Sequence, residues 1–162
     1  MTSNTQPDDS AAPGLSPAPE LRQFDRFIGT WNLVGNLVGS DAETIKGQAT
    51  YEWLPGGFFL QQHVQLDFAG FAQIDSYEMI GYDPETGTFP STVYSNMSPA
   101  PLPYRWRIDG DTVTITVTHP PLDATFTGHW SDDGNTFSGG WRPNPGADET
   151  VNVPYDIRGG RA

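Results

Sequence analysis

The sequence predicts an all-β protein: a single antiparallel up-and-down β-barrel of about 8 to 10 strands with a short N-terminal helix. The chain of 162 residues contains 18 glycines and 15 prolines, so turn signals divide it into many short segments. From Gly29 onwards apolar and polar residues alternate with a period of two, and no segment leaves room for crossover helices. A meander of this length must curl, and closure into a barrel removes both edge strands. A β-sandwich is the alternative.

The N-terminal residues differ in composition from the rest. Residues 1–19 contain four prolines and no aromatic residue, which is typical of a disordered tail. We therefore expect the barrel domain to comprise residues 20–162. Leu21, Phe24, Phe27 and Ile28 recur at helical spacing, which predicts a helix over residues 20–28 with its apolar side toward the domain.

Ten strands are then expected in sequence order, separated by turn signals such as Leu54-Pro55-Gly56-Gly57 and Asp109-Gly110. They are residues 31–37, 45–53, 58–68, 72–82, 88–96, 104–108, 112–119, 123–130, 136–142 and 150–158.

Composition restricts the partners. Asp and Glu number 20 against 8 Lys and Arg, so the formal net charge is −12. Such a surface repels phosphate backbones and anionic lipids, and we expect no nucleic-acid or membrane partner. The absence of cysteine excludes disulfides and thiolate metal sites.

No apolar run approaches the roughly 18 residues of a membrane span and no secretory signal is evident, so a cytoplasmic location is expected. A small-molecule ligand is the expected partner, and self-association into a homodimer is left open.

Three segments carry a family resemblance. Residues 27–31 (Phe-Ile-Gly-Thr-Trp) resemble the Gly-x-Trp start of the first strand in lipocalins and other calycins. Residues 56–61 and 81–89 resemble the Gly-Gly-x-Phe-Leu and Gly-Tyr-Asp-x-x-x-Gly-x-Tyr segments of a bacterial calycin-like family of unknown function. The resemblance covers residues 21–158 and implies the barrel, with no assigned activity.

The same resemblance implies a structural contact and bears on cofactors. Calycins pair the first-strand tryptophan with a basic residue on the last strand, and Trp31 and Arg158 fit those roles. Their stacking would close one end of the barrel. The related haem-binding nitrobindins use a histidine near the end of the chain, and no matching pattern is evident here. No cofactor is expected.

The third and fourth strands provide the candidate chemistry. If residues 69–71 form their turn, Gln62 faces Glu78 within an otherwise apolar face, which should point into the barrel. A buried carboxyl has a raised pKa or a polar partner, and Gln62 could donate a hydrogen bond to it. Glu78 could then orient a ligand or accept a proton.

A register shifted by one residue would exchange the two faces and place His63 and Tyr77 inside instead. Histidine is the usual acid–base side chain at physiological pH, so His63 would be the acid or base in that arrangement. The three histidines show no HxH or HExxH spacing, so no metal site is predicted.

Large side chains complete the candidate site. Besides filling the core, they could form the wall of a ligand cavity; they are Tyr51, Trp53, Leu60, Tyr94, Trp106, Phe126, Trp130 and Trp141. The first hypothesis for function is binding of a small apolar or aromatic ligand inside the barrel, with Gln62 and Glu78 as polar handles. The alternative is a cofactor-independent enzyme of the cyclase or isomerase type, with Glu78 or His63 as acid or base.

Overall fold

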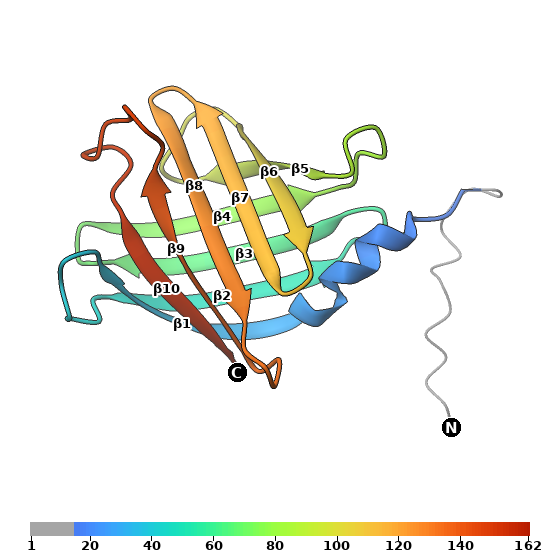
Figure 1. Ribbon diagram of the computed structural model, residues 1–162, viewed down its shortest axis with the longest axis horizontal. Coiled ribbons are helices and arrows are strands. Elements are labelled where there is room, and N and C mark those ends of the chain that lie inside the picture. Colours follow the sequence, from blue (N-terminus) through green and yellow to red (C-terminus); the bar gives the residue numbers. More distant parts are fainter. Residues whose placement is uncertain (1–14) are drawn as a thin grey trace.

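The computed structural model describes residues 15–162 and confirms the predicted fold class. Ten antiparallel strands form one closed barrel, in which each strand pairs with its neighbours in sequence and β1 pairs with β10 (Figure 1). The strands are β1 (Gly29–Leu37), β2 (Ile45–Trp53), β3 (Leu60–Phe68), β4 (Ala72–Ile80), β5 (Phe89–Ser95), β6 (Leu102–Asp109), β7 (Thr112–His119), β8 (Leu122–Trp130), β9 (Thr136–Pro143) and β10 (Tyr155–Arg161). The last strand therefore lies further along the chain than the predicted residues 150–158.

The register of β3 and β4 agrees with the predicted turn at residues 69–71. Gln62 pairs with Glu78 and Leu60 with Ile80, while His63 pairs with Tyr77 on the opposite face. The face that contains Gln62 and Glu78 points into the barrel, because it lines the interior cavity. The shifted register is therefore wrong.

The predicted N-terminal helix is present as a 3₁₀ helix, η1 (Pro19–Phe27). Leu21, Phe24 and Phe27 are buried, and their spacing of three residues matches the three-residue turn of a 3₁₀ helix. Phe24 packs edge-on against Phe89, with ring centroids 4.8 Å apart. A disordered tail was expected over residues 1–19. Residues 1–14 of this segment lie outside the described residues, and its last residue, Pro19, is the first residue of η1.

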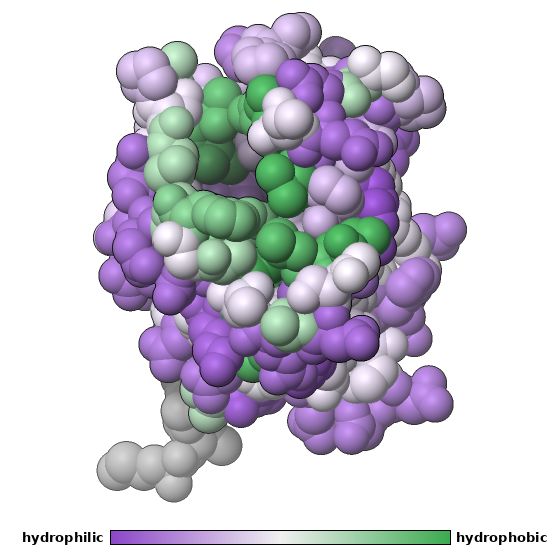
Figure 2. All heavy atoms as spheres, turned by 90° about the vertical axis from the view of Figure 1, so that its left-hand side faces the viewer, coloured by the Kyte–Doolittle hydropathy of each residue, from purple (hydrophilic) through white to green (hydrophobic). Residues whose placement is uncertain are grey.

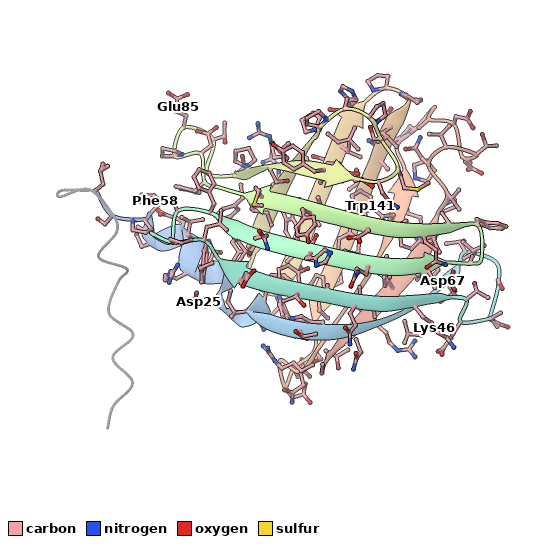
Figure 3. The ribbon with its side chains drawn as sticks, turned by 180° about the vertical axis from the view of Figure 1, so that it is seen from behind. Asp25, Lys46, Phe58, Asp67, Glu85 and Trp141 are labelled. Atoms are coloured by element: carbon pink, nitrogen blue, oxygen red, sulfur yellow. The ribbon has the colours of Figure 1, made fainter. Side chains whose placement is uncertain are left out.

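The helix makes the two ends of the barrel different. Residues 54–59, 81–88, 110–111 and 131–135 connect strands at the end that η1 covers, which we call the closed end. Residues 38–44, 69–71, 96–101, 120–121 and 144–154 connect strands at the opposite end, which we call the mouth. In Figure 3, Asp25, Phe58 and Glu85 lie at the closed end, whereas Lys46 and Asp67 lie toward the mouth.

Arg161 and Trp31 fasten η1 to the barrel. The guanidinium of Arg161 lies 4.4 Å from the centroid of the Trp31 ring and donates to the carbonyl oxygens of Arg26 (2.5 Å) and Ile28 (3.2 Å). The indole N–H of Trp31 donates to the carbonyl oxygen of Phe27 at 2.7 Å. Three consecutive carbonyls at the end of the helix, which have no partner within it, thus receive side-chain donors.

The predicted pairing of Trp31 with Arg158 is therefore wrong. Trp31 is opposite Arg161 in the register, whereas Arg158 is opposite Val34. Because side chains alternate between the two faces of a strand, Arg158 points outward, where it forms an ion pair with Glu43 at 2.7 Å.

One glycine permits an unusually close approach of two strands. A Cβ atom at Gly47 would lie only 1.9 Å from the backbone oxygen of Gln65, so any side chain there would push β2 away from β3. Such glycines allow the strong bending that closure of a small barrel requires.

We expect Trp31→Ala to lower the free energy of unfolding by about 3–5 kcal/mol, because it removes a buried indole from the core. Arg161→Ala should cost less, and the double variant should cost less than the sum, because both changes remove one shared contact. Chemical denaturation of the four proteins measures this coupling. Full additivity would contradict the stacking, and Arg158→Ala, which removes only an exposed ion pair, is the matched control.

Candidate functional site: a cavity open at one end

The barrel encloses a cavity of about 510 Å³. Its wall is mainly apolar and comes from every strand, and Phe27 of η1 lies at its inner end. Figure 2 looks into the mouth and shows a hollow surrounded by hydrophobic side chains. A volume of a few hundred Å³ is the usual size of a small-molecule site, so the interior has room for a ligand.

Glu78 is an acidic side chain placed near the closed end of this cavity. It is only 6% exposed and lies on β4 two residues before the strand ends. Its Oε2 atom accepts hydrogen bonds from the Ser91 hydroxyl and from the Trp106 indole N–H, both at 2.6 Å. Burial raises the pKa of the Glu78 carboxyl above its ordinary value, and these two hydrogen bonds oppose the rise.

The other carboxylate oxygen of Glu78 faces the cavity. Every fully buried side-chain nitrogen or oxygen of residues 15–162 has a hydrogen-bond partner, whereas Oε1 of Glu78 has none. Oε1 is therefore in contact with open space. A carboxylate oxygen with free lone pairs inside an apolar wall can bind a donor group of a ligand.

Gln62 takes a different partner from the one expected. Although it is opposite Glu78 in the register, its amide nitrogen donates to the Tyr51 hydroxyl at 2.6 Å rather than to the carboxylate. The Tyr51 hydroxyl thus accepts one bond and keeps its own proton available to a ligand. Burial raises the pKa of Tyr51 most strongly. The hydrogen bond from Gln62 lowers this pKa, and the nearby charge of Glu78 adds a smaller rise.

Two further tyrosines face the same space. Burial, followed by the negative charge of Glu78, raises the pKa of Tyr104 to about 12. Burial also raises the pKa of Tyr155. Both hydroxyls therefore stay protonated at neutral pH and act as donors within the cavity.

The large side chains singled out in the sequence divide into two groups. Tyr51, Trp106, Phe126 and Trp141 line the cavity. Leu60 and Trp130 are buried in the core toward the closed end, Trp53 donates its indole N–H to Asp25 of η1, and Tyr94 is 52% exposed on the outer face. The last four do not line the cavity.

His63 and Tyr77 lie outside the barrel. Their rings stack with centroids 4.1 Å apart, and the His63 imidazole contacts the Asp75 carboxylate at 2.7 Å. None of the three histidines lines the cavity, so His63 cannot act on a molecule bound there. In residues 15–162, no three His, Asp or Glu side chains gather closely enough to hold a metal ion.

Some residues that complete the site were not among those predicted from the sequence. Ser91 lies between Phe89 and Val93 on the face of β5 that points into the barrel. The alternation of side chains along β5 could therefore have identified Ser91 as an inward-facing residue. At the mouth, four separate connections carry exposed apolar side chains, namely Val38, Phe71, Met97 and Val151. Of these, Met97 and Val151 line the cavity. No pattern in the sequence brings these four loop residues together.

Comparison with known proteins gives one family. The model of the family described as protein of unknown function (DUF1579) matches residues 16–131, more than two thirds of the chain. No characterised protein matches the sequence. No helix in the described part of the chain is long and apolar enough to cross a membrane.

The raised pKa of Glu78 predicts a pH-dependent stability. Because the folded state holds this proton more tightly than the unfolded chain, the contribution of Glu78 is fully present below its ordinary pKa of 4.5 and is lost as the pH rises through the raised value. Glu78→Gln keeps an oxygen that can accept from Ser91 and Trp106 but cannot ionise. Relative to this variant, the wild type should lose unfolding free energy at about 1.4 kcal/mol per pH unit between the ordinary pKa and the raised one.

Urea denaturation of wild type and Glu78→Gln from about pH 4 to about pH 8 measures this difference. Glu52→Gln removes an exposed carboxylate on the outer face of β2 and serves as the control for overall charge. A constant difference between wild type and Glu78→Gln over this range would show that the Glu78 carboxyl is solvated.

Proposed function

The chain belongs to the DUF1579 family, and we propose that its barrel binds a small, largely apolar or aromatic molecule, with Glu78 and Gln62 as polar handles. The observation that supports this most directly is the cavity of about 510 Å³, which is open at the mouth and apolar apart from a few convergent polar groups. Apolar binding sites with a small number of placed polar groups are typical of ligand-binding proteins.

The arrangement of polar atoms defines how the ligand would enter. Glu78 offers a free acceptor oxygen, and the Tyr51 hydroxyl offers a donor proton held in place by Gln62. Both lie toward the closed end, so the ligand would enter with its polar group first. Its apolar body would then contact the aromatic wall and extend toward the apolar rim of the mouth.

An acid–base enzyme is a second candidate, favoured by the raised pKa of a carboxyl that faces the cavity. In this proposal Glu78 takes a proton from a carbon of the bound molecule, and the Tyr51 hydroxyl donates a hydrogen bond to the neighbouring carbonyl oxygen. Its signature would be exchange of that carbon-bound proton with solvent, fast with wild type and with Glu52→Gln but lost with Glu78→Gln.

Binding inside the barrel is tested by filling the cavity. Val64 lines the cavity, and its register neighbours Ala49 and Ser76 are small, so Val64→Trp can place an indole in the ligand space without displacing the strands. We expect this variant to lower the affinity for N-phenyl-naphthylamine, a neutral apolar fluorophore, by about tenfold or more, because the dye loses the volume it occupies.

Gln65→Trp is the matched control, because the adjacent residue is exposed on the outer face of the same strand. It should bind the dye like wild type. Fluorescence titration measures both affinities, and circular dichroism checks that the variants fold. Unchanged affinity in a folded Val64→Trp protein would place the dye outside the barrel and overturn the proposed function.

A further inference from the structure

The part of the chain that the structure describes places an acid deep inside the cavity but no unpaired basic side chain. Among the described residues that line it, only Glu78 and Arg142 carry ionisable charges of carboxylate or guanidinium type. Arg142 lies near the mouth end of β9, forms an ion pair with Asp156 at 2.7 Å and donates to the carbonyl oxygens of Trp141 and Tyr155. A ligand carboxylate therefore finds no positive partner near the closed end, and there it would face Glu78.

The free oxygen of Glu78 belongs to a cavity that aromatic side chains also line. Trp106 donates directly to Oε2, and Tyr51 and Tyr104 lie close enough for the charge of Glu78 to act on their hydroxyls. A carboxylate oxygen in a cavity lined by aromatic side chains suits an organic cation, because the faces of aromatic rings are electron-rich and the carboxylate supplies the opposite charge. A desolvated cation–aromatic contact is worth about 2 kcal/mol, which corresponds to roughly thirtyfold in affinity.

The protein as a whole favours the same charge. Its formal net charge of −12 produces a potential that attracts cations and repels anions approaching the mouth. The electrostatic potential around the protein and the Glu78 carboxylate deep in the cavity thus both favour positively charged ligands.

Taking the proposed function as its basis, we propose that the ligand is an organic cation: a protonated amine or a quaternary ammonium group on an apolar body, bound at Oε1 of Glu78 among Tyr51, Tyr104 and Trp106. The carboxylate form of Glu78 binds such a ligand, whereas the neutral acid does not. Binding therefore releases a proton wherever the empty cavity holds Glu78 protonated.

Among residues 15–162, Glu78 is the only group near the proposed cation position that can titrate at moderate pH. It is faced by Tyr51 from β2, Gln62 from β3, Ser91 from β5, and Tyr104 and Trp106 from β6. None of these side chains is a carboxylate, a histidine or a lysine. The pH dependence of binding thus reports the ionisation of this one carboxyl.

The test uses ligands with one body and different head groups: octyltrimethylammonium, octylamine, octanol and octanoate. Isothermal titration calorimetry with wild-type protein should give affinities for the two cations about tenfold or more above that for octanol, with octanoate weakest. The quaternary cation does not itself titrate. Its affinity should nevertheless rise with pH through the pKa of Glu78 and then become constant.

Two variants locate the effect. Glu78→Gln should remove most of the preference for the cations and flatten the pH dependence, while octanol still binds. Glu52→Gln changes the net charge equally on the outer face and should keep both. A lower preference with Glu52→Gln as well would assign it to the overall charge and overturn the proposal.

Other outcomes separate this inference from the proposed function. Equal affinity for octanol and the cations would overturn the cation inference and leave apolar binding intact. Tighter binding of octanoate would also overturn it, because the ionised Glu78 carboxylate that binds a cation repels an anionic head group. If none of the four compounds binds and the fluorophore also fails, the proposed function itself is wrong.

Discussion

The junction between η1 and β1 is the constraint on which the rest of the structure depends. Three successive backbone carbonyls at this corner would be left without partners at the end of a 3₁₀ helix. The Trp31 indole and the Arg161 guanidinium satisfy them, and the two side chains stack on each other. This fixes the helix across one end of the barrel and places Phe27 as the floor of the cavity. Without that floor the barrel would be a tube open at both ends, and Glu78 would be close to solvent.

The buried carboxyl is not required by the fold. An apolar side chain at position 78 would suit the surrounding wall and would avoid the cost of placing an ionisable group away from water. Ser91 and Trp106 occupy one oxygen and thereby fix the orientation of the other. Two donors from two strands thus hold one acceptor in position, which is the fixed geometry that the proposed binding function requires, maintained at some expense of stability. This argument, rather than the barrel itself, favours a functional role.

The alternation of side chains in the sequence was enough to predict the pairing of strands that are joined by a short turn. Alternation on both sides of the turn at residues 69–71 was sufficient to place Gln62 opposite Glu78 and both inside. The same reasoning failed for Arg158. Gly159 and Gly160 have no side chains to continue the alternation, so the sequence does not indicate that β10 extends to Arg161. Tyr155 and Ile157 line the cavity, and Arg161 is in phase with them, whereas Arg158 is not. The open cavity could not be predicted, because its volume depends on how side chains from all ten strands fill the interior together.

The pairing of β1 with β10 also constrains how the chain can reach this structure. Each of the other pairings joins strands that follow one another, so it can form as soon as the second strand has been made. Closure must wait for residue 161, and until then β1 and the last strand formed expose unpaired backbone groups along their edges. Because Arg161 also holds η1 in place, the closed end of the cavity is completed at the same moment. A growing chain therefore exposes unpaired strand edges for most of its synthesis. In that period its high net negative charge, rather than the finished barrel, opposes aggregation.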